Sequence, residues 1–83
     1  MTVQVNPIRA LREARGLTVD DLAKLAGISQ GAVMAAETGR VVSLSNQWAG
    51  AVGLLGGDFT RVCEAYRTWR VAEQTRITAR LEA

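Results

Sequence analysis

The chain is short, rich in apolar residues and slightly basic. It has 83 residues, 48% of them hydrophobic, and a formal net charge of +2. This length limits it to one domain, and this composition is too apolar for a disordered chain. The sequence has no histidine and a single cysteine, Cys63. These counts argue against a zinc site, a histidine-based catalytic site and an internal disulfide.

The sequence carries no sign of a membrane segment, an export signal or an active site. No apolar run approaches the roughly 20 residues that a membrane-spanning helix needs. The first residues, MTVQVNP, lack the basic and apolar regions of a signal peptide. No set of side chains has the spacing of a catalytic or phosphate-binding motif. We therefore expect a cytoplasmic protein that is not an enzyme and has no cofactor.

The first predicted helix begins at an asparagine–proline pair. Asn6 is a good N-cap and Pro7 fits the first helical position. Ile8 and Leu11 then follow helical spacing, and Gly16 ends the helix. Before this helix, residues 2–6 alternate polar and apolar side chains, which predicts either a short strand or a flexible arm.

The stretch from Thr18 to Gly39 predicts two short helices joined by a tight turn. Thr18 caps the first of them, Gly27 ends it, and Ser29 caps a second helix that runs to about Thr38. Six apolar residues have the spacing of two helices packed across each other: Leu22, Ala23, Ala26, Ile28, Val33 and Ala36. This arrangement is a helix-turn-helix, whose second helix usually lies in the major groove of DNA.

A fourth helix is predicted to begin after Ser43 or Ser45, either of which can cap it. It carries apolar residues at helical spacing, among them Trp48. Gly50 and Gly53 lie inside this helix, where each weakens it by about 1 kcal/mol relative to alanine. We therefore expect both glycines to be in close contact with another helix.

The last predicted helix begins after Asp58 and carries an apolar stripe. Its members are Phe59, Val62, Tyr66 and Trp69. A helix of about 24 residues is roughly 36 Å long, which exceeds a small bundle, so we expect Tyr66 and Trp69 to form a homodimer interface. The whole chain is predicted to be an all-α bundle of five helices. Residues 1–57 would form the DNA-binding domain with its N-terminal arm, and residues 58–83 the helix for packing and dimerisation.

Residues 8 to about 55 resemble the helix-turn-helix family of phage Cro and repressor proteins. The shared residues include the runs Arg15-Gly16-Leu17-Thr18 and Gly27-Ile28-Ser29-Gln30, and Glu37 two places before Gly39. The resemblance implies a lambda-repressor-like fold, a third helix that reads DNA, and a structural role for Glu37. It also implies seven DNA-contacting residues: Thr18, Ser29, Gln30, Gly31, Met34, Ala35 and Arg40. Arg9, Arg12 and Lys24 are expected to be solvated surface residues.

The sequence departs from the family at the predicted reading surface. Val19 stands where many members have a glutamine that helps to hold phosphate, and Gly31, Met34 and Ala35 offer few hydrogen bonds. A bidentate glutamine–adenine contact supplies roughly 1–3 kcal/mol of discrimination, whereas specific binders need about 4–10 kcal/mol. A regulator of this kind should therefore bind operator DNA as a dimer and read DNA shape as well.

Two functions remain open at this point. The first is a small sequence-specific transcription regulator, Cro-like or repressor-like, whose partner is double-stranded operator DNA. The second is a protein-interaction module of the same fold, such as an antirepressor or an antitoxin, which holds a protein partner and reads few or no bases.

Overall fold

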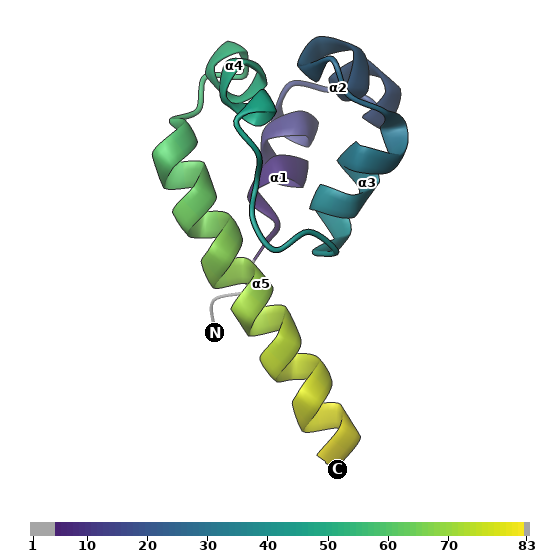
Figure 1. Cartoon of the computed structure of the whole chain (residues 1–83), viewed down its shortest axis with the longest axis vertical. Helices are drawn as coiled ribbons and strands as arrows, with labels where there is room; N and C mark the ends of the chain where they lie inside the picture. Colours follow the sequence, from purple (N-terminus) through teal and green to yellow (C-terminus); the bar gives the residue numbers. More distant parts are fainter. Residues whose placement is uncertain (1–4, 83) are drawn as a thin grey trace.

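The computed structural model describes residues 5–82, which contain five α-helices joined by short loops (Figure 1). They are α1 (Pro7–Ala14), α2 (Val19–Ala26), α3 (Gln30–Thr38), α4 (Gln47–Leu54) and α5 (Phe59–Glu82). The prediction of an all-α, five-helix protein is confirmed. Most of the segment predicted as a strand or an arm lies outside the described residues, and Val5 and Asn6 belong to no helix or strand.

The start of α1 is fixed by Asn6, as predicted, and the same side chain ties α1 to α3. Its Oδ1 accepts hydrogen bonds from the backbone N–H groups of Ile8 (2.9 Å) and Arg9 (3.0 Å). Its Nδ2 donates to the carbonyl of Ala36 in α3 at 2.9 Å. Because Asn6 is buried, the bonds to Ile8 and Ala36 lie away from water, where a lost partner is costly.

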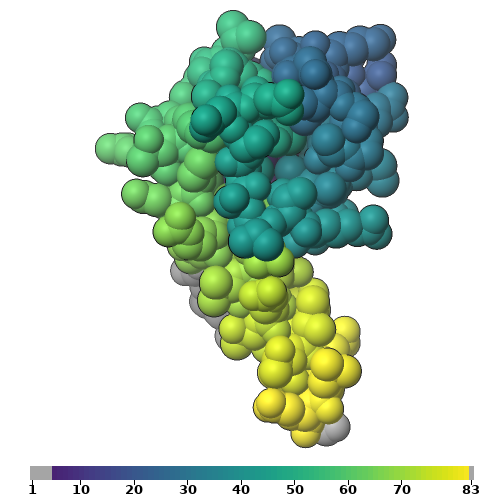
Figure 2. Space-filling model, viewed as in Figure 1, coloured from purple at the N-terminus to yellow at the C-terminus, as the bar shows by residue number. Residues whose placement is uncertain are grey.

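Side chains from all five helices pack into one hydrophobic core. Its buried members are Ile8, Leu22, Ala23, Val33, Ala36, Leu44, Trp48, Ala51, Val52, Leu55, Val62, Tyr66 and Trp69. The first half of α5 therefore belongs to the same core as α1–α4. The second half of α5 extends away from the body, and the molecule measures 41 × 23 × 23 Å (Figures 1 and 2). The division of the chain after residue 57 stays a prediction.

Tyr66 and Trp69 occupy a different place from the one predicted. Their exposed fractions are 1% and 7%, so both lie in the core of the single chain and leave almost no surface for a second copy. The Tyr66 hydroxyl donates to the carbonyl of Val41 at 2.6 Å, and the Trp69 ring lies against Gly39. The assignment of these two side chains to a dimer interface is therefore wrong. They hold the segment that follows α3.

The start of α4 also differs from the prediction. The residue before the helix is Asn46, not Ser43 or Ser45, and its backbone is already helical, with φ −62° and ψ −18°. Within residues 5–82 its side chain makes no capping bond. The Trp48 N–H instead donates to the Ser45 carbonyl at 3.0 Å, in a tighter turn.

The two glycines inside α4 do not have the close helix contact that was expected of them. A Cβ added at Gly50 or Gly53 would meet no atom within 4 Å among the described residues. Packing against another helix therefore does not explain why these positions are glycine, and that interpretation is wrong.

Candidate nucleic-acid interface

Local hydrogen bonds set the geometry of α2, the turn and α3, as the sequence predicts. The Thr18 hydroxyl accepts from the Asp21 N–H, and the Asp21 carboxylate accepts from the Thr18 N–H, both at 3.0 Å. This capping box fixes the start of α2. Gly27 ends α2 with φ +70°, in the left-handed region. Ser29 then starts α3 by accepting from the Ala32 N–H at 3.1 Å.

The inner side of α3 holds a carboxylate surrounded by arginine. Glu37 is 4% exposed, and its oxygens accept from Arg12 Nε (2.8 Å), Arg12 Nη2 (2.9 Å) and Arg9 Nε (3.3 Å). Burial alone would raise the pKa of Glu37, but the hydrogen bonds and charges of Arg12 and Arg9 outweigh it and lower that pKa. The structure therefore gives Glu37 the fold-supporting role that the resemblance implies.

Arg12 is correspondingly not the solvated surface residue that the sequence suggested. Its side chain is mostly buried, and besides Glu37 it donates from Nη1 to the Leu17 carbonyl at 2.9 Å. Arg9 is half exposed but still bound to Glu37. Lys24 is exposed, as expected, and pairs with Asp20 at 3.0 Å.

The outer side of α3 presents the predicted base-reading residues to solvent. Gln30, the first residue of the helix, and Gly31 are exposed, Met34 has an exposed fraction of 55%, and Ala35 is half-buried. The structure thus brings these four residues together on one helix face. Of these four side chains only that of Gln30 is polar, and its amide can both donate and accept.

Asp20 is a member of this surface that the sequence analysis missed. Gln30 Nε2 donates to Asp20 Oδ1 at 2.7 Å, across the turn between α2 and α3. The bonds from Lys24 and then from Gln30 lower the pKa of Asp20, so it is an acceptor at neutral pH. The signal in the sequence was an acid in the first turn of α2, but the helix dipole favours an acid there whether or not it has a binding role.

Gly31 is not required by the packing of this chain. Among the described residues, a Cβ at this position would meet only the Ser29 hydroxyl oxygen, at 3.8 Å, which is an ordinary contact. Glycine here weakens α3 relative to alanine. A glycine that the fold does not need, on an exposed face, is typical of a place where another molecule approaches the backbone closely.

The remaining predicted contacts surround this face. Thr18 and Ser29 are exposed, and their hydroxyl oxygens accept the capping bonds described above, so each hydroxyl hydrogen is available to a phosphate oxygen. Arg40 is exposed just after α3. The nearby acids Asp20 and Asp21 offset the charges of Lys24 and Arg40, so the surface is close to neutral.

The end of α3 is held by α5. Gly39 has φ +79°, and a Cβ there would lie 3.0 Å from the Trp69 ring, so only glycine fits. Arg70 Nε donates to the Gly39 carbonyl at 3.0 Å. Together with the Tyr66–Val41 bond, these contacts fix the position of α3 relative to α5.

The fold and this surface agree with a comparison against protein families. A family model described as a helix-turn-helix domain matches residues 7–77, so the chain belongs to this family of helix-turn-helix proteins, in agreement with the resemblance to Cro and repressor proteins. Membership indicates a DNA-binding regulator. A search of curated proteins and a search of solved structures found no match.

Two further observations concern the described part of the chain. Within residues 5–82, no helix is long and apolar enough to cross a membrane. The same residues hold no group of three or more side chains of the kinds that bind metal ions.

Proposed function

We propose that this protein is a sequence-specific transcription regulator, Cro-like or repressor-like, that inserts α3 into the major groove of operator DNA. Gln30 contacts a base edge, and Met34 and Ala35 contact thymine methyl groups. Thr18, Ser29 and Arg40 contact phosphates. Gly31 lets the helix backbone approach the groove.

The observation that carries this proposal is the bond between Gln30 and Asp20. A carboxylate can only accept, so Gln30 must turn its Nε2 toward Asp20. One N–H is used in this bond, and within residues 5–82 the other N–H and Oε1 make no hydrogen bond. An amide held in this orientation offers the donor and acceptor pair that matches N7 and N6 of adenine. Because the Gln30 side chain is already ordered in the free protein, DNA binding costs little further side-chain entropy at this residue.

The energy available from one chain supports binding as a dimer. Gln30 is the only exposed base-reading amide on α3, and it supplies roughly 1–3 kcal/mol of discrimination. Two chains on two half-sites double this contribution, and sequence-dependent DNA shape supplies more. Half-sites about one helical turn apart fit two such helices.

A second candidate function is supported by the composition of the same face. Met34 and Ala35 make it partly apolar, and the four charged residues around it nearly cancel. Strong phosphate binding requires a surplus of positive charge, whereas a neutral and partly apolar helix face suits a protein partner. On this alternative the chain is an interaction module, such as an antirepressor or an antitoxin.

Selection of bound duplexes from a random pool separates the two candidates. We expect an enriched motif and a complex that resists competitor DNA. Gln30→Ala should reduce preference at one base position by roughly 1–3 kcal/mol. Arg40→Ala should weaken binding to every sequence and lower the salt slope by about 1.

Gln74→Ala is the matched control, because it removes the same amide from an exposed site on the far half of α5. It should leave the enriched motif unchanged. Equal binding to all duplexes would reject the operator proposal. Absence of DNA binding at physiological salt, together with a tight protein partner whose binding requires Met34, would select the alternative.

A further inference from the structure

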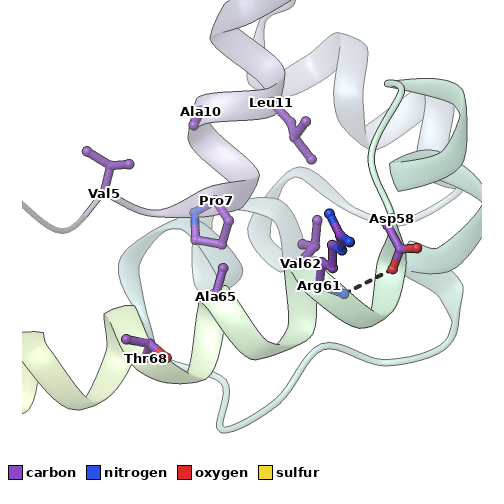
Figure 3. Close-up of a pocket in the computed structure, with 9 residues that line it drawn as sticks. All are labelled: Val5, Pro7, Ala10, Leu11, Asp58, Arg61, Val62, Ala65 and Thr68. Carbon is purple, nitrogen blue, oxygen red and sulfur yellow. Dashed lines mark hydrogen bonds between the residues drawn. The ribbon is translucent and has the colours of Figure 1, made fainter.

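An apolar groove lies between α1 and the first half of α5 (Figure 3), and none of the residues assigned to DNA lines it. Its volume is about 660 Å³. Pro7, Ala10 and Leu11 line it on the α1 side, and Ala65 and Thr68 on the α5 side, while Asp58 and Arg61 lie at one end. Nothing in the DNA-binding proposal uses this groove.

The α5 wall of the groove continues as a stripe of small residues to the end of the helix. Arg61, Ala65 and Thr68 follow one another at spacings of four and three, and the same spacing continues in Ala72, Thr75, Ala79 and Glu82. These positions share one face of a helix. A second hollow, of about 320 Å³, lies beside the later part of this stripe, at Thr75, Ala79 and Glu82.

The stripe is neutral along its length and oppositely charged at its two ends. Between Arg61 and Glu82 it contains only alanine and threonine, and both terminal side chains are exposed. Two antiparallel copies of α5 would bring the arginine end of one helix to the glutamate end of the other. Two parallel copies would instead place like charges together. Side chains no larger than threonine allow two helices to approach to about 8 Å.

We propose that the groove binds α5 of a second copy of this chain, antiparallel to the first. The far half of each α5, which extends beyond its own body in Figure 1, then lies between α1 and α5 of the other copy. Two helices of 24 residues overlap over about 36 Å, and the α1 wall widens the contact toward the roughly 800 Å² per partner of a stable interface. The symmetry is two-fold, so each copy gives and receives one helix end.

This contact replaces the interface predicted at Tyr66 and Trp69, which face the core. It does not require that the chain bind DNA, and its test contains none. The mass of the full chain is measured by light scattering and sedimentation equilibrium over a range of concentrations. We expect a dimer, and we expect Ala79→Glu to weaken it at least tenfold, because a charge would enter an apolar groove.

Ile77→Glu is the matched control. It adds the same charge two residues away, on the opposite side of the helix, at a position that is also exposed. It should leave the dimer intact. A second test reverses the terminal charges. Arg61→Glu should weaken the dimer, and the double variant Arg61→Glu with Glu82→Arg should restore it. Circular dichroism checks that each variant keeps its helix content.

Three results would overturn the proposal. The first is a single-chain mass up to millimolar concentration, which would leave the groove to a different partner. The second is a dimer unchanged by Ala79→Glu. The third is dissociation by Ile77→Glu alone, which would place the contact on the other face of α5. Failure of DNA binding with an intact, Ala79-dependent dimer would reject the regulator proposal and leave this one standing.

Discussion

The two faces of α3 differ in what their polar residues do. On the inner face, Glu37 is buried and its carboxylate receives three hydrogen bonds from Arg9 and Arg12. On the outer face, Gln30 is exposed and makes one bond, to Asp20. The first arrangement is complete within the chain, whereas the second keeps a donor and an acceptor free. One helix of nine residues therefore has an inner face whose polar groups are bonded within the chain and an outer face that, on the proposed function, contacts DNA.

The inner face should show the largest effect. Glu37→Ala removes the carboxylate that neutralises Arg12 and should lower the free energy of unfolding by about 3 kcal/mol, the lower limit for breaking a buried pair. The lower limit applies because Arg12 keeps its bond to the Leu17 carbonyl. Thermal denaturation should show a Tm lower by roughly 12 °C or more. A shift no larger than that of Glu64→Ala, on the exposed side of α5, would contradict this role.

The same carboxylate predicts an acid dependence of stability. Because folding lowers the pKa of Glu37, its contribution is present above the unfolded value near 4.5 and is lost as pH falls through the lower folded pKa. Denaturant titrations should therefore show stability falling below about pH 4.5, with a contribution from this group of up to about 1.4 kcal/mol per pH unit. In Glu37→Gln this group can no longer titrate, so the free energy of unfolding should depend less steeply on pH, by the contribution of one proton.

Substitutions of Asp20, the partner of Gln30, test whether the outer face reads DNA. Asp20→Ala removes the acceptor that orients the amide, so preference at the base read by Gln30 should fall several-fold. Asp20→Asn removes the same charge but keeps an oxygen acceptor, and should retain that preference while binding all DNA more tightly. Quantitative binding to the selected motif and to a scrambled duplex measures both. Equal behaviour of the two variants would mean that only the charge matters.

The smallest effect should come from Gly31. Alanine fits without a clash and suits a helix better, so Gly31→Ala should raise the free energy of unfolding by up to about 1 kcal/mol. The added methyl group lies where the helix backbone would approach DNA, so affinity should fall at the same time. A variant that is more stable and binds equally well would show that the outer face does not require glycine here.

The helix-turn-helix could be predicted from the sequence because its signals are local. Thr18, Gly27 and Ser29 each act on backbone groups within a few residues, and the structure has each cap where it was expected. The prediction of a serine cap for α4 was wrong because it required backbone angles that the sequence does not show. Serine residues stood nearby, but the backbone at Asn46 is already helical, and the sequence does not reveal backbone angles.

Side-chain partners far apart in the chain could not be predicted in the same way. Arg12 was expected in solvent because helical spacing places it off the apolar stripe, yet Glu37, 25 positions later, draws it inward. Tyr66 was expected at an interface because the helix is long, but its hydroxyl finds the Val41 carbonyl. Periodicity shows which residues share a face, and it does not show which element covers that face.

The three contacts between α5 and the segment after α3 have a consequence for spacing on DNA. The Trp69 ring packs on Gly39, Arg70 donates to the Gly39 carbonyl, and Tyr66 donates to the Val41 carbonyl. These contacts attach α5 directly to the end of α3. In a pair of chains joined through α5, the distance and tilt between the two copies of α3 are then properties of α5. Lengthening or shifting that helix by a turn would change the preferred separation of half-sites while leaving the bases read within each half-site the same.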